Sequence, residues 1–138
     1  MSMVHDNRIK GYRVDFEAQI LTMNTIYYNH ANETIENTDV VFAGYLTHVF
    51  NHVTKDNIIF DIEEYPIHLF LEYEYELLKA NKNYGWPVFY NDENGLSEFL
   101  QSNQYKVFQI SSSCGLCGWV LAKQMDIIVD EQPFNSTR

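Results

Sequence analysis

Apolar and polar residues alternate along two neighbouring stretches near the start of the chain. Residues 12–17 read YRVDFE, in which every second residue is charged, and this period of two is typical of a half-buried strand. Residues 20–28, ILTMNTIYY, are rich in β-branched and aromatic residues and predict a second strand. Because only two residues separate these strands, we expect them to form an antiparallel hairpin.

The alternation resumes after a polar segment, residues 29–39, which we interpret as a loop. Residues 40–50, VVFAGYLTHVF, predict a single strand. After a turn at residues 52–57, residues 58–63 predict another strand, with Asp61 and Glu63 on one side. The apolar face of the first of these strands is assigned to Val40, Phe42, Leu46 and Phe50, and that of the second to Ile58, Phe60 and Ile62.

The apolar period becomes helical after Pro66, a residue that suits the first turn of a helix. Gly85 and Pro87 are expected to end this helix, and residues 88–90 predict a short strand. Asp92 is expected to cap a second, shorter helix. The first helix is expected to bury a stripe made of Ile67, Phe70, Leu71, Leu77 and Leu78, and the second to bury Leu96, Phe99 and Leu100.

Three more strands are predicted in the last third of the chain, at residues 105–110, 118–123 and 125–131. Strands followed by helices and then by strands again predict an α+β fold. We expect an antiparallel sheet of about five to seven strands with two helices packed on one face. The chain length predicts a single domain over residues 1–138, with frayed residues 1–8 and 132–138.

The composition is that of a folded and strongly acidic protein. Hydrophobic residues make up 46% of the 138 residues, which is enough for a core and argues against disorder. The net charge of −10 disfavours nucleic acid as a partner and favours a basic protein. The first residues lack the apolar stretch of a signal peptide, and no apolar run reaches the roughly 20 residues of a membrane span. We therefore expect a cytoplasmic protein with no membrane partner.

Both cysteines of the chain, Cys114 and Cys117, lie in the sequence SSSCGLCGWVLA. A structural zinc site needs four ligands, and the missing two would have to be His48 and His52. Residues four apart along a strand lie about 13 Å apart, which is too far for one ion. A redox centre would need the first cysteine at a helix N-terminus, but the sequence that follows is extended. We favour a tight connection between two strands over metal or redox chemistry, and we expect no cofactor.

No motif of an established catalytic chemistry is present in the sequence. The serines before Cys114 are not in a G-x-S-x-G elbow, and there is no P-loop, G-x-G-x-x-G or H-E-x-x-H motif. Asp61 and Glu63, with Glu64 beside them, are carboxylates of the kind that bind a cation or transfer protons. We favour a solvated strand face for them, because oxygen-ligand sites usually need more groups. The sequence therefore identifies no catalytic residue, and we expect no enzyme.

Glu74 is the one carboxylate that falls within the apolar stripe of the first predicted helix. A carboxylate at such a position is unfavourable unless it is paired or hydrogen-bonded. One interpretation is a residue of a pocket between the sheet and the helices. The interpretation that we favour is a helix rolled so that Glu74 lies at the edge of the sheet and meets Arg13 or a tyrosine.

Tyrosines and glutamates are concentrated around the first predicted helix. Tyrosine is common at protein interfaces because it offers a large contact area at low entropic cost. An acidic and aromatic surface suits a basic protein partner, although the tyrosines could equally complete a small core. The residues predicted to form such a partner-binding surface are Asp61, Glu63, Glu72, Tyr75 and Glu76.

The segments YRVDF, NIIFDIEEYP, YGWP and GWVLAK resemble small uncharacterised proteins of Bacillus and related bacteria. Some of those proteins look like immunity proteins of bacterial toxin cassettes. The resemblance implies a non-enzymatic protein that neutralises a basic partner such as a toxin, and it identifies no catalytic residue. The alternatives are a small-molecule binding domain or hydrolase that uses Glu74. Self-association as a homodimer is also left open.

Overall fold

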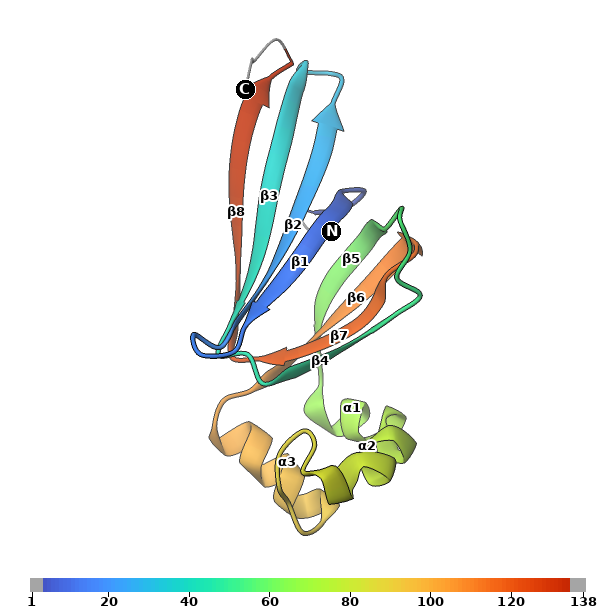
Figure 1. Ribbon diagram of the computed structural model, residues 1–138, viewed down its shortest axis with the longest axis vertical. Coiled ribbons are helices and arrows are strands. Elements are labelled where there is room, and N and C mark those ends of the chain that lie inside the picture. The colour runs from blue at the N-terminus through green and yellow to red at the C-terminus, as the bar shows by residue number, and fades with distance from the viewer. Residues whose placement is uncertain (1–3, 135–138) are drawn as a thin grey trace.

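The computed structural model describes residues 4–134 as an eight-stranded antiparallel sheet with three short α-helices (Figure 1). The order of strands across the sheet is β4-β7-β6-β5-β1-β2-β3-β8. The α+β class and the antiparallel sheet are confirmed, while the predicted numbers of strands and helices are too small. The strands are β1 (Arg8–Asp15), β2 (Ile20–Asn29), β3 (Thr34–Ala43), β4 (Thr47–Asn51), β5 (Ile58–Tyr65), β6 (Lys106–Cys114), β7 (Cys117–Ala122) and β8 (Gln124–Pro133). The helices are α1 (Ile67–Tyr73), α2 (Tyr75–Asn81), the 3-10 helix η1 (Lys82–Tyr84) and α3 (Glu93–Ser102).

The sheet divides into two four-stranded halves that pack against each other. β1 and β5, where the halves meet, share a single paired position, Arg8 with Ile58, whereas β3 and β8 pair along ten positions. Figure 1 shows β1, β2, β3 and β8 on one side and β4, β5, β6 and β7 on the other. The core between the halves contains Leu21, Met23, Val40 and Phe42 from the first and Ile59, Ile62, Phe108, Ile110 and Val120 from the second.

The chain crosses from one half of the sheet to the other at two short connections that lie side by side. β3 continues through residues 44–46 into β4, and β7 continues through Lys123 into β8. Because β3 pairs with β8 and β4 pairs with β7, the two bends form one continuous corner. At this corner Lys123 N–H donates to Ala43 O at 2.9 Å, and Leu46 N–H donates to Leu121 O at 2.8 Å.

The corner corrects the prediction of one strand at residues 40–50. Gly44 has a φ of 67°, which only glycine adopts readily, and the chain turns there. After the turn Tyr45 packs in the core between the halves and Leu46 packs with the helices, the reverse of their assigned faces, whereas Phe50 packs against the core with Val40 and Phe42 as assigned. The predicted loop at 29–39 is also wrong from Thr34 onward, because pairing with both β2 and β8 holds this polar segment extended.

The helices cover the outer face of the second half of the sheet. Val107 of β6, with Trp119 and Leu121 of β7, packs against them. The residues next to these, such as Phe108 and Val120, point into the core between the halves. β7 is therefore buried on both faces, which explains why its sequence is apolar without alternation.

The predicted first helix is two helices that meet at Glu74. The backbone there departs from helical geometry, with φ −97° and ψ 16°. The apolar stripe nevertheless buries Phe70, Leu71 and Leu78 as predicted. The predicted cap of the next helix is confirmed, because Asp92 Oδ1 accepts the N–H of Gly95 at 2.7 Å. No strand forms at residues 88–90.

Three further expectations are wrong. A bulge in β5 turns Phe60 outward, where it is 51% exposed, and places Ile59 in the core instead. Phe99 of α3 is only partly covered and stacks on Tyr105. Of the predicted frayed ends, residues 1–8 and 132–138, the part that the structure describes contains a fully buried Val4 and the end of β8 at Pro133. Residues 1–3 and 135–138 lie outside the described part of the chain.

Gly118 offers a test of how tightly β4 and β7 approach. Its φ is 147°, and an added Cβ would collide with the Val49 carbonyl oxygen of the neighbouring strand. We expect Gly118→Ala to lower the free energy of unfolding by about 3 kcal/mol. Gly44→Ala should lower it by only about 1 kcal/mol, because its added Cβ meets the flexible Lys123 side chain.

Gly11 is the matched control, since a Cβ there meets nothing within 4 Å. We expect Gly11→Ala to change stability by less than about 0.5 kcal/mol in urea unfolding. Equal losses at all three glycines would contradict the described packing at the β4–β7 interface.

Candidate partner-binding site

The face of the sheet that carries the helices continues beyond them as a row of acidic residues on β5. The side chains of residues 61, 63 and 65 point to the same side of this strand, because successive residues of a strand point to opposite sides. Tyr65 packs with the helices. Asp61 and Glu63 therefore share the helix-bearing face, as their predicted common face requires. Glu63 lies opposite Gln109 of β6, and Asp61 lies opposite Ser111. The acidic row leads directly to the start of α1.

Tyr65 joins this row to the glutamates of α1. Its ring meets the ring of Tyr73 edge-on, with 6.1 Å between centroids. Partial burial raises the pKa of Tyr65, and the neighbouring Tyr73 and the Glu72 carboxylate raise it further. Glu72 is exposed and directly precedes Tyr73 on α1. Tyr73 itself is 77% exposed and available to a partner.

A cavity of about 210 Å³ lies beside the two tyrosines, between α1 and the sheet. Glu74 lines it at the break between α1 and α2, on the side of the helix that faces the sheet. A position beside Tyr65 and Tyr73 in a cavity between the helices and the sheet matches the pocket interpretation of Glu74 and the tyrosine part of the favoured one, whereas Arg13 is not part of the lining. The lining consists of Tyr65, Phe70, Tyr73, Glu74, Val107, Gln109 and Trp119.

The back wall of the cavity is a fixed aromatic cluster. The Phe70 ring packs edge-on against Trp119 with 4.7 Å between centroids, and Trp86 packs on the same indole at 6.0 Å. Trp86 is held in turn by its indole N–H, which donates to Thr47 Oγ1 of β4 at 2.9 Å. The lining residues thus combine one carboxylate with four aromatic rings and include no basic side chain.

We name the surface around this cavity the acidic patch, defined as Asp61, Glu63, Tyr65, Glu72, Tyr73 and Glu74. Three of the predicted partner-binding residues belong to it, and a fourth, Glu76, is exposed on the next helix, α2. Tyr75 lies elsewhere, in a groove between α2 and α3 with Lys79 and Lys82. Lys79 Nζ lies 5.8 Å from the centre of the Tyr75 ring, so this groove is not acidic throughout.

Sequence reasoning counted Tyr65 and Tyr73 among the tyrosines around the first predicted helix but did not select them as partner-binding residues, and it did not assign Gln109 or Trp119 to the site. Tyr65 could have been found, because it continues the alternation of Asp61 and Glu63 along the strand. Gln109 and Trp119 come from strands about 45 to 55 residues further along the chain, and their place depends on the strand order. No local pattern in the sequence specifies that order.

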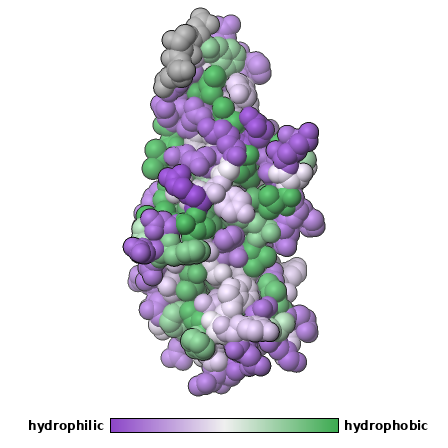
Figure 2. Space-filling model, viewed as in Figure 1, coloured by the Kyte–Doolittle hydropathy of each residue, from purple (hydrophilic) through white to green (hydrophobic). Residues whose placement is uncertain are grey.

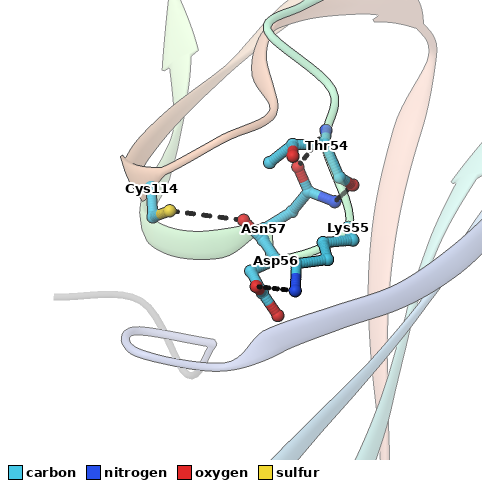
Figure 3. Close-up of polar contacts among 5 residues, drawn as sticks. All are labelled: Thr54, Lys55, Asp56, Asn57 and Cys114. Atoms are coloured by element: carbon cyan, nitrogen blue, oxygen red, sulfur yellow. Dashed lines mark hydrogen bonds and ion pairs between the residues drawn. The ribbon is translucent and has the colours of Figure 1, made fainter.

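The segment with the two cysteines is a connection anchored by Asn57. Asn57 Oδ1 accepts the N–H groups of Leu116 at 2.8 Å and of Thr54 at 3.1 Å, and its amide donates to Thr54 O at 2.6 Å. Figure 3 shows this side chain in its loop, with the Cys114 Sγ directed at the Asp56 carbonyl oxygen, 3.3 Å away. Leu116 lies in the connection between β6 and β7 and is fully buried, so the two strands diverge to make room for its side chain.

The predicted candidates for metal ligands do not converge in this region. His52 Nδ1 lies 3.4 Å from Cys117 Sγ, but His48 points to the opposite face of β4 and bonds Tyr45 Oη at 2.7 Å. Burial lowers the pKa of His48. Within residues 4–134, no group of three or more His, Cys, Asp or Glu side chains is arranged to hold a metal ion.

Comparison with protein families, curated proteins and solved structures finds no match to this chain. Among the helices described, none is long and apolar enough to cross a membrane. The geometry of the acidic patch is therefore the basis for a functional hypothesis.

The arrangement around the cysteines makes a test of metal content direct. We expect protein purified without added zinc to contain well under one equivalent of zinc, since one imidazole and one thiol give too few ligands for a structural site. Elemental analysis of the wild type and of Cys117→Ser measures this. A stoichiometric zinc that disappears in the variant would contradict the interpretation of a structural connection.

Proposed function

We propose that this chain is a non-enzymatic binding protein whose acidic patch docks on a basic protein. We further propose that the cavity beside Glu74 receives a lysine or arginine side chain of that partner. The observation that carries the proposal is the composition of the cavity, which offers four aromatic rings, one carboxylate and no basic side chain. Aromatic faces attract cations, and a carboxylate completes the site with a charge-assisted hydrogen bond.

The surroundings of the cavity support a protein partner rather than a free cation. Glu63 and Glu72 are both exposed and lie outside the cavity lining, so carboxylates are present beyond the cavity itself. The net charge of −10 gives the whole chain a field that accelerates encounter with a basic protein. The resemblance to immunity proteins agrees with a basic toxin as the partner and with a cytoplasmic place of action.

The alternative of a small-molecule site or hydrolase has less support. A cavity of about 210 Å³ is smaller than the roughly 300–1,000 Å³ typical of small-molecule sites. Glu74 is the only carboxylate in the lining, and no histidine, cysteine or serine stands beside it as a nucleophile or second acid–base group. A side chain inserted from a partner fits such a small cavity better than a whole substrate does.

Glu74→Gln tests the anchor pocket with little change in shape. The probe is N-acetyl-arginine methylamide, titrated against the wild type while the Trp119 indole N–H is followed by NMR. We expect Glu74→Gln to weaken binding by about tenfold, since a hydrogen bond to a charged group contributes about 1.5–3 kcal/mol. The uncharged isostere N-acetyl-citrulline methylamide should bind no better to the wild type than to the variant.

Glu76→Gln is the matched control, because it removes the same charge from an exposed position outside the cavity lining. We expect its effect on the arginine probe to be less than about twofold, as is usual for screened surface charges. Equal weakening by Glu74→Gln and Glu76→Gln would show that the probe responds to net charge alone and would contradict an anchor pocket.

A further inference from the structure

β8 forms an open edge of the sheet and is distant in the strand order from the acidic patch. It pairs with β3 along its whole length and has no strand on its other side within the described chain. In Figure 1 it is the outermost strand of the upper part of the molecule. Figure 2 shows hydrophobic side chains interspersed with hydrophilic ones along this side. An edge strand presents unpaired backbone N–H and C=O groups that another chain can pair with.

The register identifies which groups of β8 are free to pair. Phe134 N–H donates to Glu33 O at 2.9 Å, just beyond the last paired position of the two strands. Because the pairing with β3 contains no register shift, even-numbered residues of β8 hydrogen-bond to β3 throughout. The odd-numbered residues turn their backbone groups to the open side, and these are Met125, Ile127, Val129 and Glu131.

β8 has few of the features that usually protect an edge strand. Such strands are commonly short or bulged, or carry lysine or proline. β8 has ten residues, no bulge against β3, no basic residue, and no proline before Pro133. The opposite edge of the sheet differs, because β4 has only five residues and its Thr47 is covered by Trp86.

Each face of β8 combines apolar and acidic side chains. Ile128 is 58% exposed on one face, and Val129 is 42% exposed on the other. Asp126 and Asp130 share the face of Ile128. Each is oriented along the strand by a glutamine, since Gln124 Nε2 bonds Asp126 at 2.8 Å and Gln132 Nε2 bonds Asp130 at 3.0 Å.

We propose that β8 accepts an extended basic segment of another protein as a ninth strand. Lysine or arginine at alternate positions of that segment would face Asp126 and Asp130, while apolar residues between them would cover Ile127 and Val129. Backbone pairing supplies affinity in such strand addition, and the alternating side chains supply specificity. The variants that test this proposal lie outside the acidic patch, so the proposal is tested independently of the proposed function.

A second copy of the chain is the occupant that charge disfavours. β8 carries three carboxylates and no cation, so two copies would bring six carboxylates to one seam. With Ile128 opposite its equivalent, Asp126 of each copy would lie opposite Asp130 of the other. Each chain also carries a net charge of −10. A basic segment instead neutralises the charges that a second copy would double.

Val129→Pro tests strand addition, because it removes one outward N–H and leaves the bonds to β3 intact. The probe is a nine-residue peptide of alternating lysine and valine, titrated against the full chain by NMR. We expect wild-type binding that weakens with salt and protects the Ile127 and Val129 amides from hydrogen exchange. Val129→Pro should lose at least about tenfold in affinity, whereas the matched Val129→Ala should stay within about threefold.

Two controls make the result decisive. A peptide of the same length whose central valine is proline should bind the wild type at least about tenfold more weakly. If thermal melting shows that Val129→Pro is unstable, the double variant Asp126→Asn/Asp130→Asn replaces it. This variant should weaken the binding of the lysine peptide but not that of a serine–valine peptide. Glu74→Gln should leave the protection of the Ile127 and Val129 amides by the lysine peptide unchanged, because lysine bound in the cavity beside Glu74 does not pair with β8, and this readout separates the test from that of the acidic patch.

Three outcomes would overturn the proposal. The first is that the lysine peptide binds Val129→Pro as tightly as it binds the wild type, or that the proline-containing peptide binds the wild type as tightly as the lysine peptide does. Either result shows attraction without strand pairing. The second is no binding of the lysine peptide at low salt. The third is a dimer in sedimentation equilibrium that Val129→Pro abolishes, because the edge would then be occupied by a second copy.

Discussion

The corner at Gly44 and Lys123, where two paired strands bend together, determines where the other elements lie. Because both strands turn at the same place, the sheet folds back over its own inner face and encloses a core between its halves. The outer face of β6 and β7 is then left for the helices. A straight ribbon of the same strands would have given an open sheet with a single core and no third layer.

Two-sided burial of β7 links this architecture to the candidate site. Trp119 is packed on several sides, because Val120 beside it lies in the core between the halves and Phe70 and Trp86 pack on its indole. The rigid indole forms the back of a cavity whose front is the exposed Tyr73. Binding to such a preformed wall costs less conformational entropy than binding to mobile side chains, so modest contact areas give useful affinity.

The sequence predicted those features that depend on neighbouring residues. The α+β class, the buried stripe of Phe70, Leu71 and Leu78, and the cap at Asp92 follow from local periodicity and capping chemistry, and each is present. The features that were missed depend on partners distant in the sequence. Pairing on both sides holds residues 34–39 extended against their polar composition, and a bulge reverses the orientation of Phe60.

The candidate site shows the same division. Asp61, Glu63 and Glu74 were selected from their own strand or helix pattern, and the structure brings them to one surface. Tyr75 was grouped with them by proximity in sequence, yet the turn of the helix directs it toward Lys79 instead. The aromatic wall could not be predicted, because it requires the order of β5, β6 and β7 across the sheet.

The pairing of β3 with β8 also has a consequence for how the chain acquires its structure. The hairpin of β1 and β2 joins neighbouring segments, and β3 adds to it soon after, so these strands emerge from the ribosome with all they need to pair. The far side of β3, and the whole of β4, have no partner until the final segments of the chain are made. During that interval the apolar face of the first three strands has no cover, since β5 to β7 supply the other wall of the core. Such late closure favours slow folding and leaves apolar surface exposed while the chain is incomplete, which is the condition that chaperones relieve.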